Sequence, residues 1–444
     1  MTISPSDSSI FGSSFGHPAV AAAFSDEQSV ESMLRVEAAL ARVLGGHGLI
    51  PEPAAAQIAQ AASQVKVDLD RLQAETERAG FPVAELVRQL RTQAGEEAGE
   101  FVHWGATTQD ILDTARVLQI RDSLQPVELA LETLIARLAK LAERHRSQLM
   151  VGRTHTQQAL PITFGYKVAT WLAPLLRHRR RLAELKPRLL VLQFGGAVGT
   201  LAAYGEHGPV LYEAMAKELG LGLAVAPWHS QRDGYAEFAG WLSLLTGSLA
   251  KLAQDVLLMS QTEIGEVREA ADRSRGGSSA MPQKANPVAS EQMLAAARAN
   301  AALLSSMHHA MVQEHERGTH GQQLEWLSLP QMLTLAASAL NKAVFVAENL
   351  EVDGRRMLAN LQDSQGTILA ERFRNALAAE MGRQEAEALV KEACQIALTE
   401  HRALGAVLRE RTAVSLDWEN LSDPNQYLGS VHWFVDRILQ QAHS

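Results

Sequence analysis

Cysteine, aromatic residues and long uncharged apolar runs are all scarce in this chain of 444 residues. A single cysteine, Cys394, excludes an intramolecular disulfide and a cysteine-ligated metal site. Its flanking residues are typical of a helix, so we expect Cys394 to act as a small core hydrophobe. Aromatic residues make up 5% of the chain while alanine and leucine dominate, and this balance favours helix over strand.

The charge balance excludes several classes of partner. The formal net charge is −9 and the isoelectric point is near 5.9, so we expect neither nucleic acid nor an anionic membrane as a partner. Residues 1–15 lack the basic and apolar segments of a signal peptide. No uncharged apolar stretch approaches the roughly 18 residues of a membrane span. We therefore expect a soluble, cytoplasmic protein.

Apolar residues recur with helical spacing along most of the chain. Residues 127–141 and 242–259 repeat at alternating steps of three and four, the pattern of long helices packed nearly parallel in a bundle. A first helix is expected to start near residues 25–27 and to end at Gly45 and Gly46. Further expected helices are residues 162–186, 234–268, 288–313, 366–381, 384–403 and 430–441. The sequence therefore predicts an all-α protein, either an ordinary monomeric bundle or an oligomer.

The most informative segment is the loop at residues 277–287. Its small residues can present consecutive N–H groups to an anion. Two hydroxyls, Ser278 and Ser279, are followed by the cation Lys284 and the amide Asn286. This combination predicts a clamp for a carboxylate-bearing substrate, with a candidate proton-transfer serine inside it. A plain Gly/Ser connector between helices is the alternative.

A second polar segment covers residues 103–110. Thr107 and Asp110 have the spacing of a capping box, so a helix is expected to begin there. The free N–H groups at such a helix start favour an anion. The alternative is a cap without a ligand, with His103 as a hydrogen-bonded interior histidine.

The remaining polar segments also lie at expected helix ends. In residues 152–161, Arg153 places a cation beside His155, the side-chain type best matched to proton transfer near neutral pH; a solvated turn between two long helices is the alternative. Farther along, Arg232 with Gln231 has the donors to grip a carboxylate, unless this segment only caps a helix. Arg317 belongs to a charge run that on its own is typical of a solvated face.

Signals for cofactors and metals are missing from the sequence. Residues 195–199 are glycine-rich but lack the flanking strand and helix of a dinucleotide site, so we expect them to permit a turn or a close helix approach. No His-Glu-x-x-His or similar metal spacing is present. We therefore expect neither a metal nor an organic cofactor.

The loop at residues 277–287 resembles the signature of the fumarase/aspartase superfamily, GSSxMPxKxNP. Residues 103–110 and 152–161 resemble the two other common regions of that superfamily, in the expected order. The resemblance covers roughly residues 10–430. It implies an all-α fold with three domains, a long central bundle, and a homotetramer whose active sites are each built from three subunits. We place the domains at residues 1–108, 109–350 and 351–444.

The superfamily's reaction, addition to or elimination across the bond next to a carboxylate, implies roles for these residues. Ser278 is the implied proton-transfer serine, and His155 the second acid/base residue. A serine hydroxyl is a poor base unaided, so loop amides and Lys284 would have to stabilise its alkoxide. The expected substrate-binding residues are His103, Thr107, Thr108, Arg153, Gln231, Arg232, Ser279, Lys284, Asn286 and Arg317.

Two branches of the superfamily share most features of this chain, the adenylosuccinate lyases and the 3-carboxy-cis,cis-muconate cycloisomerases. The first branch should carry a serine pair and an arginine soon after the His-Glu-Arg segment at residues 315–317, to hold the AMP phosphate. Residues 318–326 contain no such cluster. The charge-assisted hydrogen bonds of such a phosphate clamp would be hard to replace. The resemblance therefore favours the cycloisomerase branch.

That branch closes 3-carboxy-cis,cis-muconate to γ-carboxymuconolactone in the protocatechuate branch of the β-ketoadipate pathway. The substrate is a small tricarboxylate whose own carboxylate is the nucleophile, so three anion sites and one acid are required. Whether His155 or Ser278 handles the proton stays open. The alternatives are an adenylosuccinate lyase-type C–N lyase and a catalytically dead structural oligomer. The joint presence of Ser278, His155, Lys284 and Asn286 argues against the second.

Overall fold

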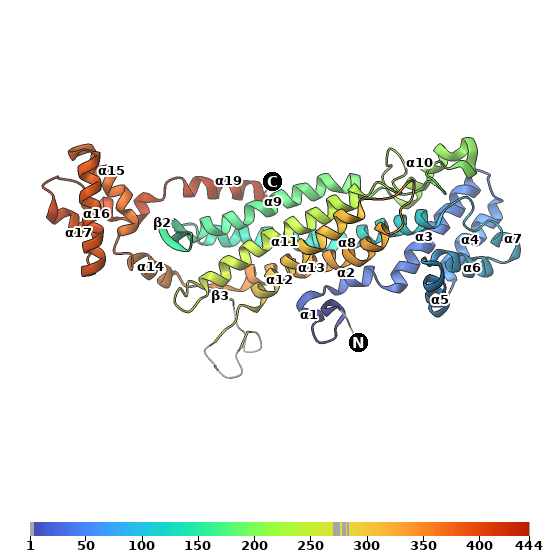
Figure 1. The fold of residues 1–444 in the computed structure, drawn as a ribbon, viewed down its shortest axis with the longest axis horizontal. Helices are drawn as coiled ribbons and strands as arrows, with labels where there is room; N and C mark the ends of the chain where they lie inside the picture. Colours follow the sequence, from blue (N-terminus) through green and yellow to red (C-terminus); the bar gives the residue numbers. More distant parts are fainter. Residues whose placement is uncertain (1–3, 270–275, 278–280, 282–283, 444) are drawn as a thin grey trace. The chain divides into compact units, whose positions relative to one another are not determined.

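The structure, a computed structural model, describes residues 4–269, 276–277, 281 and 284–443. Helices dominate these residues, as predicted, and Figure 1 labels them in chain order. Contacts group the chain into two compact units, each assembled from three segments. Unit 1 comprises Met1–Ala130, His178–Gly247 and Ala295–Leu340, and unit 2 comprises Leu131–Arg177, Ser248–Leu294 and Asn341–Ser444. The three-domain division remains a prediction.

Short helices near the N-terminus build much of the core of unit 1. They are α1 (Gly12–Phe15), α2 (Pro18–Ala23), α3 (Asp26–Gly46), α4 (Glu52–Gln64), α5 (Leu69–Ala79), α6 (Val83–Ala94) and α7 (Glu96–Gly99). The Ser25 hydroxyl caps α3 by accepting a hydrogen bond from the Gln28 N–H, so this helix starts where the sequence predicted. Helices α3 to α7 lie together (Figure 1). Their core contains fully buried side chains such as Leu44 and Leu90.

Longer helices follow, and their predicted apolar seams are buried. They are α8 (Thr108–Arg144), α9 (Phe164–Leu189), α10 (Gly208–Leu219), α11 (Asp233–Met259), α12 (Val288–Ala310) and α13 (Gly321–Asn349). The buried seam residues of α8 are Val127, Leu131, Leu134, Leu138 and Leu141; those of α11 are Leu242, Leu245, Leu249, Leu252, Val256 and Met259. Burying one such side chain contributes about 1.5–3 kcal/mol, so these seams are a large part of the stability of the long helices.

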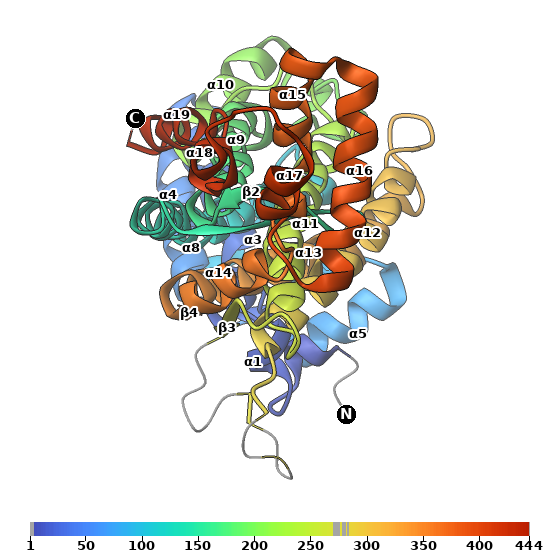
Figure 2. The ribbon, with the colours of Figure 1, turned by 90° about the vertical axis from the view of Figure 1, so that its left-hand side faces the viewer.

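The C-terminal helices build a second core, which belongs to unit 2. They are α14 (Gly354–Gln362), α15 (Ala370–Met381), α16 (Arg383–Glu400), α17 (Leu404–Arg411), α18 (Trp418–Ser422) and α19 (Val431–His443). Figure 2 shows α15, α16 and α17 side by side, around buried residues that include Phe373 and Leu404. Cys394 packs against this cluster and is partly buried, in agreement with its expected role, and burial raises the pKa of its thiol.

Four short strands depart from the purely helical prediction. Strands β1 (Leu149–Thr154) and β2 (Gln157–Thr163) pair antiparallel, as do β3 (Val267–Glu269) and β4 (Leu350–Val352). The predicted helix over residues 234–268 ends at Met259 instead. The chain turns back there through Gly265, which adopts a left-handed φ of 60°. The Glu266 N–H then donates to the Met259 carbonyl and leads into β3.

Helix α11 bears on the expectation about membranes. By length and composition it is apolar enough to cross a membrane, and among the described residues it alone meets that test. Half of its most apolar window is buried inside the protein. Core helices of soluble proteins pass the same test, so the finding is weak evidence for a membrane span.

Candidate active site

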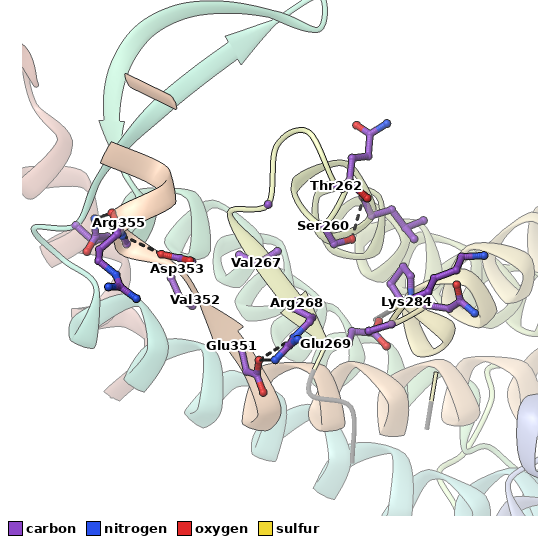
Figure 3. Close-up of a pocket in the computed structure, with 18 of the residues that line it drawn as sticks. Ser260, Thr262, Val267, Arg268, Glu269, Lys284, Glu351, Val352, Asp353 and Arg355 are labelled. Atoms are coloured by element: carbon purple, nitrogen blue, oxygen red, sulfur yellow. Dashed lines mark hydrogen bonds and ion pairs between the residues drawn. The ribbon is translucent and has the colours of Figure 1, made fainter. Parts of the chain in front are cut away.

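The described end of the signature loop lies on the wall of a cleft in unit 2 (Figure 3). The cleft has a volume of about 1140 Å³, and both Lys284 and Asn286 line it. The Asn286 N–H donates to the Gly276 carbonyl at 2.8 Å and ties the two sides of the loop together. Gly276 has φ = 72°, and a Cβ there would lie 2.5 Å from the Asn286 carbonyl oxygen, so glycine is required. Ser278 and Ser279 lie outside the described residues.

The carboxylates of this cleft are engaged by described partners, whereas no described residue pairs with Lys284. Arg268 donates to Glu351 at 2.9 and 2.5 Å between β3 and β4, as Figure 3 shows. Glu269 caps the start of α12, and Asp353 caps α14. Lys284 is exposed and forms no ion pair with any described residue. Two predicted substrate-binding residues, Lys284 and Asn286, therefore line the same cleft, and their role in binding stays a prediction.

His155 occupies the tip of the β1–β2 hairpin in unit 2. The alternative interpretation was a solvated turn between two long helices, but this segment forms two strands joined by a two-residue turn. His155 and Thr156 both have positive φ, 49° and 66°. Turns of this kind favour Asn-Gly because other residues are strained there. A histidine that is exposed and held in a strained conformation is more typical of a functional position than of a structural one.

Arg153, also on the hairpin, is anchored by a buried acid. Its guanidinium donates to both oxygens of Glu266 at 2.8 and 2.7 Å, and Asn360 donates to the same carboxylate at 2.9 Å. Glu266 is fully buried while Arg153 keeps about a fifth of its side chain exposed. The ion pair therefore fixes the base of the hairpin and leaves further guanidinium N–H groups for another acceptor.

The N-terminus of α8 is a candidate anion site in unit 1. The Thr107 N–H donates to Asp110 at 3.1 Å, which confirms one half of the predicted capping box. The Thr107 hydroxyl accepts a hydrogen bond from Arg317 at 2.8 Å, and Arg317 also donates to the Ala197 carbonyl at 2.7 Å. Thr108 is the first residue of the helix. A helix start carries roughly half a positive charge, and the exposed Arg317 adds a full one. Three predicted substrate-binding residues therefore meet here.

Asp110 does more than cap the helix. The N–H groups of Gly195 and Gly196 donate to its two oxygens at 2.8 and 2.9 Å, and His229 Nε2 lies 3.0 Å from the first. Gly196 has φ = 68°, which confirms the turn expected in residues 195–199. The fully buried Asp110 therefore holds the glycine loop against the start of α8. Sequence reasoning missed this function because the acid and its partners are about 85 residues apart.

His103 lies just before this helix and pairs with a buried acid on α3. Its Nδ1 is 2.6 Å from Glu37 Oε1. Burial alone lowers the pKa of His103, but the charge and hydrogen bond of Glu37 outweigh it and raise the pKa above its usual value. Glu37 was not predicted, although its position on the buried face of α3 was a signal. A carboxylate among apolar helix positions needs a partner.

The contacts of Arg232 argue for a structural role in place of the predicted binding of substrate. Its guanidinium donates to Asp113 at 2.7 and 2.9 Å and to Glu325 at 2.8 and 2.5 Å, and it is only 2% exposed. The charged partners raise the pKa of Arg232 despite its burial. Arg232 is therefore a structural ion pair. Its neighbour Gln231 is exposed and donates to the Ser230 hydroxyl, so it remains a candidate.

Comparisons with known proteins cover nearly the whole chain. A family model described as Lyase matches residues 14–299, and one described as Adenylosuccinate lyase C-terminus matches residues 366–438. The 3-carboxy-cis,cis-muconate cycloisomerase of Pseudomonas aeruginosa is 45% identical over 443 residues, 98% of this chain and 96% of that protein. Trans-aconitate decarboxylase 1 of Mycosarcoma maydis is 41% identical over 97% of this chain and 88% of its own.

Solved structures agree with the sequence comparisons. The crystal structure of 3-carboxy-cis,cis-muconate lactonizing enzyme from Pseudomonas putida superposes with a TM-score of 0.93 at 42% identity, covering 98% of this chain and 99% of that one. The predicted all-α superfamily fold is thereby confirmed. The order of the three polar regions, the residues of the signature loop and these full-length matches lead to one conclusion: this chain belongs to the fumarase/aspartase superfamily of lyases.

Proposed function

We propose that this chain catalyses the lactonisation of 3-carboxy-cis,cis-muconate to γ-carboxymuconolactone, as an intramolecular lyase of protocatechuate degradation in the β-ketoadipate pathway. The observation that carries the proposal is the 45% identity, over 98% of this chain, to the Pseudomonas aeruginosa cycloisomerase. The structural similarity to the lactonizing enzyme of Pseudomonas putida supports it independently of any single residue.

The reaction is an isomerisation, and its chemistry suits the groups in both units. A C–O bond forms when the substrate's own carboxylate adds to the conjugated double bond, and a C–H bond forms when the α-carbon takes up a proton. Between these steps negative charge accumulates on the carboxylate next to the α-carbon. Donors that are already in place stabilise such charge most effectively. Lys284 with Asn286, and Arg317 with the start of α8, are donors of this kind.

We assign the three substrate carboxylates to these donors. Lys284 and Asn286 are proposed to bind one carboxylate, and Arg317 with Thr107 and Thr108 a second. The remaining proposed substrate-binding residues, for the third carboxylate and the carbon skeleton, are His103, Arg153, Gln231 and Ser279.

The proton donor is proposed to be His155 or Ser278. His155 is exposed at the tip of a strained turn, which supports a direct role. Ser278 is supported only by its place in the signature loop. Alanine variants of each separate the two: the residue whose loss leaves near-full activity is excluded as the acid.

We further propose that the chain forms a cytoplasmic homotetramer in which different copies complete each active site. On α11, Leu244 and Leu258 are 56% and 41% exposed, whereas half of the most apolar window of this helix is buried. Gly247 and Lys251 lie on the same face at steps of three and four residues. Exposed leucines on such a helix support coverage by other copies. Size-exclusion chromatography with light scattering tests the proposal, which a monomer would contradict.

The test of the activity is direct. Purified protein is incubated with 3-carboxy-cis,cis-muconate while loss of the conjugated-diene absorbance and formation of the lactone are followed. Adenylosuccinate and trans-aconitate are run in parallel, because members of this superfamily and one relative act on them, as their names state. Rapid loss with lactone as product supports the proposal. Turnover of adenylosuccinate or trans-aconitate alone assigns a different substrate. Absence of turnover with all three compounds supports a non-catalytic oligomer.

A further inference from the structure

His103 and Glu37 form a shielded carboxylate–imidazole pair beside the anion site of unit 1. Glu37 lies on α3, and His103 lies in the loop before α8, 66 residues later, so only the fold brings them together. The imidazole Nδ1–H donates to Glu37 Oε1 at 2.6 Å, a short distance typical of a charge-assisted hydrogen bond. The Glu37 side chain is fully buried, whereas 18% of the His103 side chain is exposed. The histidine is therefore the member of the pair that can reach a ligand.

The partners of Glu37 indicate a charged histidine. No described residue donates a hydrogen bond to its second oxygen, Oε2, which is buried. An ionised carboxylate in that situation is costly unless its one partner carries the opposite charge. The other charged groups that act on His103 are Asp110 on α8, which favours the imidazolium, and Arg91 on α6, which opposes it. The sum of these influences raises the pKa of His103 above its usual value.

The same contact sets the direction of the ring. With Nδ1 committed to Glu37, the Nε2–H is the donor that remains on the opposite edge of the imidazole. The backbone of His103 has φ = 62°, a left-handed conformation that is unfavourable for histidine. Strain of this kind persists where surrounding contacts hold a side chain in a particular orientation. Thr107, whose hydroxyl contacts Arg317, follows four residues later.

We propose that Glu37 is a positioning residue that keeps His103 protonated and turns its Nε2–H toward a carboxylate of the substrate. Glu37 touches no substrate and acts only through His103. This inference rests on the proposed function for the identity of the ligand, a polycarboxylate. The pairing and its effect on the charge of His103 do not depend on that function.

The first test measures the charge of His103 without using activity. Trypsin releases residues 92–116 as one peptide in which His103 is the single histidine. Hydrogen exchange at the histidine C2 position, followed by mass spectrometry across pH, therefore reports the pKa of His103 in the full-length protein. Glu37→Gln keeps the shape and an acceptor but removes the charge, so the pKa of His103 should fall. Glu85→Gln, which removes another buried carboxylate of unit 1, is the matched control and should leave it unchanged.

The second test measures catalysis with a double-mutant cycle. Loss of one charged hydrogen bond predicts about a tenfold to hundredfold drop in kcat/KM for Glu37→Gln, mostly through KM. In the pH profile of kcat/KM for this variant, the fall at high pH should move to lower pH, because His103 loses its proton at a lower pH. In a His103→Asn background, Glu37→Gln should cost less than about twofold. Glu37→Asp should restore part of the effect.

The outcomes separate the two proposals. An unchanged pKa of His103 in Glu37→Gln, or fully additive effects in the cycle, overturns the positioning function of Glu37. An inactive wild-type protein on 3-carboxy-cis,cis-muconate, together with the expected fall in the His103 pKa, overturns the proposed substrate and leaves the pair intact.

Discussion

Replacing Arg232 with methionine should destabilise unit 1 and leave substrate affinity unchanged. The sequence suggested a carboxylate-binding arginine, but all four hydrogen bonds of its guanidinium go to Asp113 and Glu325. The rings of Trp228 and Tyr235 lie 4.9 and 5.0 Å from its central carbon. The side chain is therefore enclosed by acids and aromatic rings, and a substrate would have to displace an internal carboxylate to reach it.

The magnitude follows from what the substitution leaves behind. Breaking a buried ion pair by removing one partner costs about 3–5 kcal/mol, because the other charge stays buried and uncompensated. Here Asp113 and Glu325 both lose their partner, so we expect Arg232→Met to lower the free energy of unfolding by at least about 4 kcal/mol. A typical domain is stable by about 5–15 kcal/mol, so the loss is a large share. Adding Asp113→Asn and Glu325→Gln removes the orphaned charges and should recover most of it.

Urea unfolding followed by circular dichroism measures this change. Protein concentration is held fixed, since oligomers gain apparent stability with concentration. KM for 3-carboxy-cis,cis-muconate is measured in parallel under conditions where the Arg232→Met variant is folded. A wild-type unfolding midpoint combined with a tenfold rise in KM would refute the structural assignment and restore Arg232 as a substrate-binding residue.

Three further substitutions test the sites themselves. Lys284→Met removes an exposed cation that has no described partner. We expect kcat/KM to fall about 10- to 150-fold, equivalent to about 1.5–3 kcal/mol of charged hydrogen bonds, while the urea midpoint stays unchanged. Activity equal to that of the wild type contradicts a role of Lys284 in substrate binding. Asn-Gly in place of His155-Thr156 relieves a strained turn and should raise the free energy of unfolding by about 1 kcal/mol. If His155 supplies the proton, activity falls by at least about 10²-fold in the same variant, and retained activity excludes it. Asp110→Asn weakens the anchoring of the glycine loop that Arg317 contacts. We expect the free energy of unfolding to fall by about 2 kcal/mol and KM to rise. A variant with unchanged stability and unchanged KM contradicts the anchoring function.

Local patterns in the sequence predicted the helices well. The start of α3 at Asp26, with Ser25 as its cap, follows from side-chain chemistry within one turn. The seam from Leu242 to Met259 is a period that the sequence displays directly, and every member of it is buried. The β1–β2 hairpin was missed because its turn contains His155 and Thr156, without the asparagine and glycine that announce such a turn.

The candidate site was predictable as a set of residues but not as a set of contacts. Lys284, Asn286, Thr107 and Arg317 were identified because motifs name residue types at fixed spacing. The structure places the first two on one cleft and joins the last two by a hydrogen bond. What decides whether a polar side chain faces a ligand is its long-range partner. Arg232 shows the consequence, because its partner Glu325 lies 93 residues away and no local pattern announces it.

Buried acids explain how a chain with a net charge of −9 can serve a tricarboxylate substrate. Four buried acids each bind an internal partner. Glu37 binds a histidine and Asp110 binds two backbone N–H groups, while Glu266 and Glu325 each bind an arginine. Their charges are compensated where they lie and contribute little to the field at the surface of the sites. The groups left to face a ligand are the exposed cations and the N-terminus of α8. An acidic protein can thus present locally positive sites, because these buried acids are compensated internally and hold the sites in shape.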